Sequence, residues 1–177
     1  YACAALGALG DRQAIPQLRD AITLDRAEPY AAAALAALDA LGHTVPGFDA
    51  RDGARRPPAG FARCEAHEDT LGWHYRRAYH CASAPAQRTV PLPFHAPRGD
   101  QLLVLRGKWS SSLTAPVALR DVRGVELARW SVGPGWEEVR VALRTSPGGR
   151  YRLDLAPDGG PVPAALQMAH ALVLPLR

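Results

Sequence analysis

Apolar residues recur at helical spacing at the start of the chain. In the first nine residues, Ala2, Ala5, Leu6 and Leu9 lie at positions i, i+3, i+4 and i+7. This spacing puts them on one face of a helix, because an α-helix turns once every 3.6 residues. The pattern therefore predicts a short amphipathic helix at the start of the chain.

The same helix pattern returns later in the sequence. Residues 1–10, moved forward by 29 positions onto residues 30–39, match in seven of ten places. A second helix is predicted between the two copies, over residues 13–23, and Gly10 and Gly42 are helix stops. Self-similarity at such a period is typical of stacked helical repeats, in which each unit covers the apolar face of its neighbour.

The residues around this repeat carry a family resemblance. The stretch Leu6-Gly-Ala-Leu-Gly-Asp-Arg-Gln-Ala-Ile-Pro-Gln-Leu18, with the Ala-rich helix that follows, resembles the short HEAT-like repeats of the phycobilisome-lyase type over about a quarter of the chain. It departs at Glu28-Pro29-Tyr30, where that family usually has Val-Arg. The resemblance implies stacked helical hairpins and contacts with proteins, but no activity. Since one and a half repeats do not make a stable solenoid, we expect further repeats before Tyr1.

Short alternating runs replace the helical pattern in the last 105 residues and predict eight β-strands. The predicted strands cover residues 75–82, 88–95, 101–109, 116–121, 125–132, 137–143, 150–155 and 168–176. Pro91 and Pro93 remove two N–H donors from the same side of one strand, which should therefore lie at a sheet edge. Eight antiparallel strands in this length suit a jelly-roll or immunoglobulin-like sandwich.

These patterns predict an α+β chain in two parts joined by a linker. Residues 1–42 are expected to be the end of a HEAT-like array, and residues 73–177 an antiparallel β-sandwich. Between them, residues 43–72 lose the apolar periodicity and are rich in Pro, Gly and Arg, so we predict a linker there. Hydrophobic residues make up 47% of the chain, enough for a core, and no apolar run reaches the roughly 20 residues of a membrane span.

Charge is concentrated in the C-terminal part. The chain has 21 basic residues, of which Lys108 is the single lysine, and residues 73–177 hold fourteen of them against seven acids. With Val and Leu of the same strands facing inward, Arg120, Arg140 and Arg152 should face outward. If their strands are neighbours, the three guanidinium groups form one strip that suits sulfate, carboxylate or phosphate. The alternative is a solvated face on which they pair with Glu126 or Glu138.

No motif in the sequence supports catalysis. The chain has no Gly-x-Ser-x-Gly elbow, Glu137 and Glu138 are adjacent on a strand and so face opposite ways, and no Gly-rich loop is followed by the Lys of a phosphate-binding motif. We therefore expect no enzyme activity in this chain and no cofactor. For the full-length protein the question stays open, since a catalytic domain can precede Tyr1.

Cysteine and histidine residues cluster around the start of the predicted sandwich. Cys64, His67, His74, His80 and Cys81 include residue types that zinc takes, but His80 and Cys81 point to opposite faces of a strand, and the spacing matches no zinc module. We therefore predict no metal site. A disulfide between Cys64 and Cys81 is compatible with an oxidising compartment, although three cysteines do not decide it.

The leading interpretation is a non-catalytic accessory region of a bacterial protein outside the cytoplasm. The helices would contact an upstream domain or a partner protein. The sandwich would bind a glycan, an anionic one included, or pack on an upstream domain. Trp136 follows Gly133-Pro-Gly135 and is the tryptophan expected to be exposed, so that it could stack on a sugar. The alternative is the tail of a hydrolase such as a sulfatase-like enzyme. Nucleic-acid binding is disfavoured, because no recognisable module interleaves basic and aromatic residues.

Overall fold

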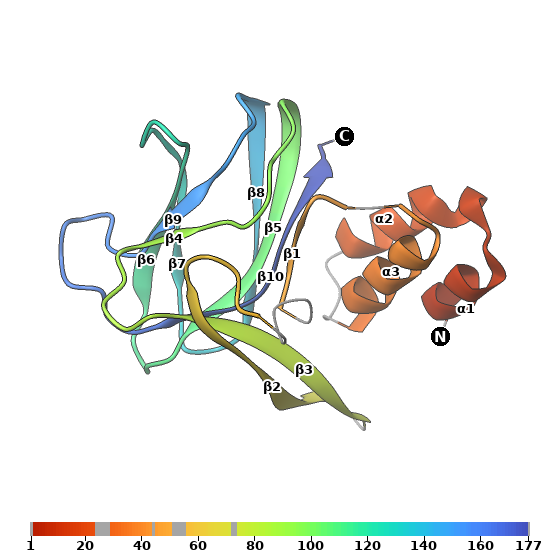
Figure 1. Cartoon of the computed structure of the whole chain (residues 1–177), viewed down its shortest axis with the longest axis horizontal. Helices are drawn as coiled ribbons and strands as arrows, with labels where there is room; N and C mark the ends of the chain where they lie inside the picture. Colours follow the sequence, from red (N-terminus) through yellow and green to blue (C-terminus); the bar gives the residue numbers. More distant parts are fainter. Residues whose placement is uncertain (1, 24–28, 44, 51–55, 72–73, 177) are drawn as a thin grey trace. The chain divides into compact units, whose positions relative to one another are not determined.

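The computed structural model of the chain describes residues 2–23, 29–43, 45–50, 56–71 and 74–176 (Figure 1). The chain forms two compact units, Tyr1–Val45 and Pro46–Arg177. The first unit is helical and the second is built of β-sheets. In the described part of the chain, no helix has both the length and the apolar character needed to cross a membrane.

The described residues of the helical unit form three short α-helices, of which the first two pack against the third. They are α1 (Ala2–Leu9), α2 (Ile15–Thr23), which follows the 3-10 turn η1 (Arg12–Ala14), and α3 (Pro29–Ala40). Both α1 and α2 pack against α3. At the crossing of α1 and α3, a Cβ on Gly7 would lie 2.8 Å from the Cα of Ala37, so only glycine permits this approach. Three short helices do not by themselves establish a stacked repeat array.

Glycine ends two of these helices, as the sequence predicts. Gly10 and Gly42 have positive φ angles of 71° and 69°. Beyond them, the backbone N–H of Asp11 donates to Leu6 O at 3.4 Å, and that of His43 donates to Leu38 O at 2.9 Å. These bonds satisfy carbonyl groups that the last helical turn leaves without a partner.

The second unit is an antiparallel β-sandwich, which confirms the predicted β-sandwich. Its larger sheet has the strand order β2-β3-β10-β5-β8, with β1 paired to β10, and its smaller sheet has the order β4-β9-β6-β7 (Figure 1). The strands are β1 (Gly47–Asp49), β2 (Phe61–Leu71), β3 (His74–Ser83), β4 (Thr89–Pro91), β5 (Gly99–Trp109), β6 (Ala115–Arg120), β7 (Glu126–Val132), β8 (Glu137–Ser146), β9 (Arg152–Asp154) and β10 (Leu166–Pro175). Each of the eight predicted strands overlaps one of these. The strand that holds Pro91 lies at a sheet edge, as expected.

The segment predicted as a linker contains two β-strands of the sandwich. Residues 43–72 contain β1 and β2, and β2 pairs with β3 from Phe61 to Leu71. Phe61 and Phe48 stack with ring centroids 5.2 Å apart and belong to the core of the sandwich. The breakers that suggested a linker end at Gly60, one residue before β2, and charged residues along the strand hide its alternation.

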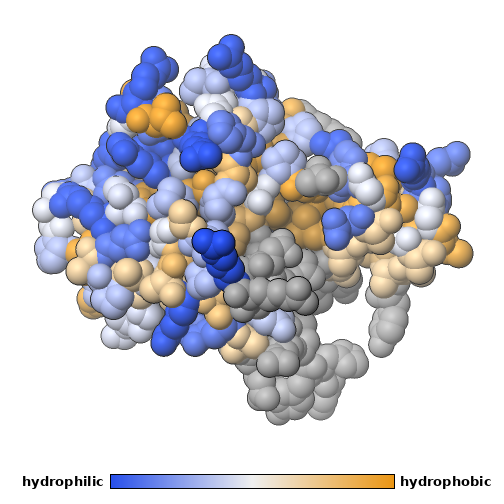
Figure 2. Space-filling model, viewed as in Figure 1, coloured by the Kyte–Doolittle hydropathy of each residue, from blue (hydrophilic) through white to orange (hydrophobic). Residues whose placement is uncertain are grey.

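Side chains from both sheets meet in one apolar core. Leu103, Leu105 and Trp109 of β5 are almost fully buried and face Leu119 and Leu153 of the smaller sheet. Figure 2 shows the visible face of the sandwich as largely hydrophilic, with a hydrophobic spot at the tip of the β6–β7 hairpin, where Val122 and Val125 are exposed. The alternation of inward apolar and outward polar residues is the ordinary pattern of a sandwich strand.

A disulfide joins Cys64 of β2 to Cys81 of β3, which are opposite each other in register. The bridge that the sequence left open is therefore present, and Cys3 is a free cysteine. Cys81 is fully buried in the core, so the disulfide ties the β2–β3 hairpin to the body of the sandwich.

We predict that replacing Cys64 and Cys81 together by Ala lowers the free energy of unfolding by about 3 kcal/mol. The two cysteines are 17 residues apart in the sequence, and a cross-link over such a loop reduces the conformational entropy of the unfolded chain. Urea unfolding followed by tryptophan fluorescence would measure the change, and dithiothreitol should reproduce it in the unaltered protein. Cys3→Ala is the control and should leave the midpoint unchanged. Equal midpoints for the double variant and the parent would contradict the prediction.

Candidate ligand-binding surface

The three arginines singled out in the sequence do not form one strip. Arg120 of β6 and Arg152 of β9 are register partners in the smaller sheet. Arg140 lies on β8, in the larger sheet. Period-two alternation indicates which way a residue faces within its own strand, but not which sheet the strand joins. The expectation of a shared strip is therefore wrong for Arg140.

The outer face of the smaller sheet is a network of ion pairs. The guanidinium of Arg120 donates from Nε to Asp154 Oδ2 at 3.0 Å and from Nη1 to Gly124 O at 3.1 Å, and its Nη2 lies 3.1 Å from Glu126 Oε2. Arg129 joins the network through Glu126 and Asp158. Its hydrogen bond to Glu126 is the main reason that the pKa of that carboxyl is lower than its ordinary value.

Arg140 is also paired with an acid. Its Nε and Nη2 donate to Glu138 Oε1 at 2.9 and 2.8 Å. The pairings with Glu126 and Glu138 are the ones that the sequence offered as the alternative to a binding strip, and for Arg120 and Arg140 the structure shows this alternative. A guanidinium held by carboxylates has few donors left for an anionic ligand.

A different group of residues gathers on the outer face of the larger sheet. We call it the Trp136 surface and define it by Trp136 itself, Arg106 and Lys108 of β5, His80 of β3 and Glu65 of β2. Strand register brings them together: Glu137 pairs with Gly107 of β5, so Trp136 comes level with Lys108. Likewise, Glu65 is opposite His80 on the neighbouring pair of strands.

Trp136 is the centre of this surface. Its indole is half-buried and meets the ring of His80 edge-on, with ring centroids 5.7 Å apart. The Nζ of Lys108 lies 5.2 Å from the centroid of the indole, and the Cζ of Arg106 lies 6.0 Å from it. Cations at these distances are attracted by the negative face of an aromatic ring. The contacts hold the indole in one orientation while part of it stays exposed.

Polar side chains complete the Trp136 surface. His80 is buried, and its Nε2 lies 3.2 Å from Glu65 Oε1, which in turn lies 3.5 Å from Arg63 Nη2. The surface therefore combines an aromatic ring with donors and an acceptor around it. This is the mixture of an apolar platform and directed polar groups that binds sugars, whose rings have apolar C–H faces and hydroxyl edges.

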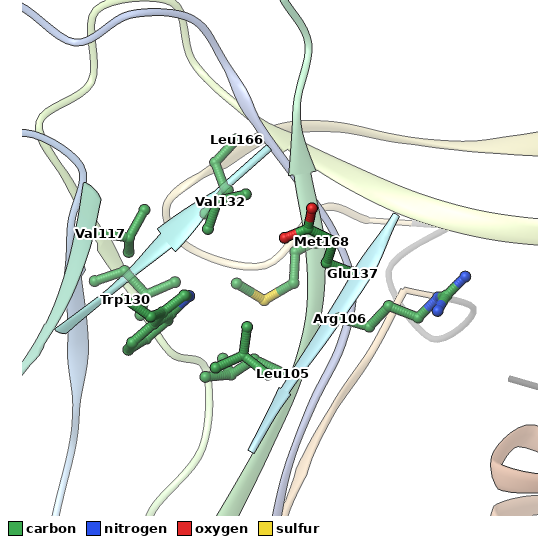
Figure 3. A pocket seen from close by; sticks show the side chains of 11 residues that line it. Leu105, Arg106, Val117, Trp130, Val132, Glu137, Leu166 and Met168 are labelled. Carbon is green, nitrogen blue, oxygen red and sulfur yellow. The ribbon is translucent and has the colours of Figure 1, made fainter. Parts of the chain in front are cut away.

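A small cavity lies between the two sheets (Figure 3). Its volume is about 20 Å³, and its lining includes Leu105, Val117, Trp130 and Met168, with Met168 pointing into it. Gly107 also lines it and needs to be glycine, because a Cβ there would lie 2.9 Å from the carbonyl oxygen of Gln167. A cavity of this size holds about one water molecule. It is a packing defect and not a site for a sugar.

The cysteine and histidine cluster does not form a thiolate metal site, because Cys64 and Cys81 are bonded to each other. In the described ranges of the chain, no group of three His, Cys, Asp or Glu residues is placed to hold a metal ion. The side chains of His67 and His74 lie outside the described residues.

Sequence reasoning singled out Trp136, which is half-buried in the structure, and did not single out its neighbours. Arg106 and Lys108 belong to a strand that was predicted correctly, and the alternation in β5 would have placed both on the outer face. Their closeness to Trp136 depends on the register between β5 and β8, which the sequence does not reveal. The one available signal was that Lys108 is the single lysine among 20 arginines.

No protein-family model matches the sequence, and no curated protein matches it. Among solved structures, the chain is similar to a CBM36 carbohydrate-binding module in complex with calcium and xylotriose, at 13% identity and a TM-score of 0.44, covering 72% of this chain and 98% of that chain. It is similar to the C-terminal CBM6 module of a laminarinase from Zobellia galactanivorans, at 8% identity and a TM-score of 0.43, covering 73% and 98%. It is also similar to an exo-beta-1,3-galactanase from Phanerochaete chrysosporium, at 13% identity and a TM-score of 0.44, covering 74% and 29%. Values this low do not assign the chain to a family.

Glu138, next to the Trp136 surface, gives the larger sheet a pH dependence. Burial raises the pKa of this carboxyl, but His170, whose Nε2 lies 3.8 Å away, and Arg140 lower it by more, so its pKa lies below its ordinary value. Arg106 of β5 is opposite Glu138 in register. A carboxyl whose pKa is lowered on folding stabilises the folded state above its unfolded pKa. That stabilisation is lost as the pH falls through the folded pKa.

We predict that Glu138→Gln reduces the loss of stability between pH 6 and pH 3, because the amide does not take up a proton in this range. Urea unfolding of the variant and the parent at pH 6, 4.5 and 3 would measure it, with the two curves converging at the lowest pH. The matched control is Glu137→Gln on the same strand. Parallel pH profiles for parent and Glu138→Gln would overturn the prediction.

Proposed function

We propose that the β-sandwich is a non-catalytic module that binds a glycan at the Trp136 surface. The observation that carries the proposal is the indole of Trp136, which His80 and Lys108 hold in place while part of it remains exposed. A ring that is already held in one orientation loses little conformational entropy when a ligand binds. One face of a pyranose can pack on the indole, while its hydroxyl groups reach the polar groups around it.

One carboxylate of this surface and one next to it support binding over catalysis. Glu65 is within 3.2 Å of His80, and Glu138 accepts hydrogen bonds from Arg140. Glycoside hydrolysis needs two carboxyl groups that flank the scissile bond with different protonation states. Acids that are each paired with a basic group suit the recognition of hydroxyls. The Cys64–Cys81 disulfide supports a location outside the cytoplasm, because structural disulfides persist in oxidising compartments.

We predict that Trp136→Ala weakens glycan binding at least tenfold, which corresponds to about 1.4 kcal/mol, because the stacking platform is lost. Trp136→Phe should retain most of the affinity. Affinity electrophoresis of the whole chain in gels that contain xylan, laminarin, galactan or polygalacturonate would measure it. Arg123→Gln, an exposed change on the β6–β7 hairpin, is the control. Failure of the parent chain to bind any of the polymers, or equal retention of Trp136→Ala, would overturn the proposal.

A second candidate function concerns the helical unit, and a comparison of its two related helices favours it. Shifted by 29 positions, Leu9 of α1 corresponds to Leu38 of α3, but Leu9 is 78% exposed whereas Leu38 is fully buried. In the same way Ala5 is exposed, and its equivalent Ala34 is fully buried. In α3 these positions belong to a helix that packs on α1 and α2. We infer that α1 presents this face to a helix pair of the same kind.

We predict that a chain with residues 1–29 duplicated ahead of Tyr1 gains helix content and thermal stability, because the added helices cover Leu9. Burial of one leucine is worth about 2 kcal/mol. Circular dichroism and thermal unfolding would measure both gains. Leu9→Asp in the original copy should be neutral in the parent chain, where Leu9 is exposed, and should abolish the gain in the extended chain. An added segment that stays unfolded would contradict the inference.

A further inference from the structure

Lys108 differs from six arginines of the sandwich in the partner it has. In the ion pairs of the structure, an Asp or Glu lies within 4.0 Å of Arg63, Arg120, Arg123, Arg129, Arg140 and Arg144. Among the residues that the structure describes, no carboxylate forms such a pair with Lys108. Its contact is the indole of Trp136. Within the described part of the chain, the ammonium group therefore has an aromatic contact and no carboxylate within 4.0 Å.

Two described acids of the larger sheet, Glu65 and Glu138, are paired with residues other than Lys108. Glu65 lies 3.2 Å from His80 and 3.5 Å from Arg63, and Glu138 accepts from Arg140 at 2.8 Å. Arg106 adds a second positive charge at 6.0 Å from the indole centroid. The half-buried ring of Trp136 is therefore in contact with the ammonium group of Lys108, at the place where a stacked sugar would be held.

We propose that the glycan bound at the Trp136 surface is acidic, and that its carboxylate or sulfate group binds to Lys108 while the sugar ring stacks on Trp136. This proposal rests on the glycan-binding function given above and names its ligand class. The lysine ammonium offers three hydrogen-bond donors and a full charge. A hydrogen bond between two charged groups is about twice as strong as one between neutral groups, so the acidic group would make a substantial part of the affinity.

The contact between Lys108 and Trp136 also prepares the ammonium group for binding. A free lysine side chain loses much rotamer freedom when its head group is fixed by a ligand. Lys108 has already given up part of this freedom by lying against the indole. One surface thus fixes both the ring that stacks on the sugar and the charge that selects among sugars.

The sharpest test compares polymers that differ only in charge. Polygalacturonate and its methyl ester share one backbone, as do dextran sulfate and dextran, and the two pairs separate carboxylate from sulfate as the bound group. We expect the whole chain to bind at least one acidic polymer about tenfold more tightly than its neutral partner at low salt. The preference should shrink between 0.05 and 0.5 M NaCl, because exposed charges are screened over a shorter distance.

Variants of Lys108 assign the preference to this residue. Lys108→Gln should reduce binding of the acidic polymer to the level of its neutral partner, and Lys108→Arg should retain the preference. Arg123→Gln removes the same charge from the other sheet and should change nothing. Unchanged melting temperatures show that the variants fold. Because Lys108 is the single lysine, its acetylation, followed by mass spectrometry with and without polymer, also reports directly whether the ligand covers it.

The outcomes separate this proposal from the proposed function. If the neutral polymers bind as tightly as the acidic ones and Lys108→Gln has no effect, the acidic ligand class is wrong, whereas loss of binding in Trp136→Ala still supports glycan binding. If Lys108→Gln weakens binding of a polymer and Trp136→Ala does not, the surface binds by charge alone, and the stacking platform is wrong. If the parent chain binds neither kind of polymer, both proposals fail.

Discussion

The alternation of residues along β5 is the constraint on which the sandwich and its surface both depend. Leu103, Leu105 and Trp109 face the core, and Arg106 and Lys108, on the same strand, face outward. β5 lies between β10 and β8, so both neighbours take their register from it. A slip of one residue would bury the two cations and expose the tryptophan, at a large cost in free energy. The core therefore fixes where the cations lie.

Charge pairing divides the basic residues of the sandwich into two groups. Arg120 and Arg129 of the smaller sheet and Arg140 of the larger sheet are neutralised by acids on their own or adjacent strands, which makes those faces soluble without making them selective. Lys108 has an aromatic partner in place of an acid. A basic pI of about 9.3 says nothing about this difference. The local partner of each charge, and not the total, distinguishes a solvated face from a binding surface.

Much of the fold could be predicted from the sequence, because period-two alternation and turn residues are local signals. They were sufficient for the eight strands from Tyr75 onward and for the edge position of the strand with Pro91. β2 was missed because its charged residues and the preceding Pro57-Pro58 and Gly60 imitate a linker. The paired Arg120 and Arg152 and the separate Arg140 illustrate the other limit. The side of a strand on which a residue lies follows from local alternation. The sheet to which the strand belongs depends on contacts between residues far apart in the sequence.

The Trp136 surface has no sequence motif for the same physical reason. Glu65, His80, Lys108 and Trp136 come from four segments, and the distances between them in the chain bear no relation to a binding pattern. Two pairings create the surface: β2 with β3, fixed by the Cys64–Cys81 disulfide, and β5 with β8, fixed by the core. His80 belongs to the first pair and the indole to the second, and their rings meet at 5.7 Å. The edge-on contact between these rings thus connects the β2–β3 hairpin to the segment before β8 at the other side of the larger sheet, and the surface is complete only when both pairings are in register.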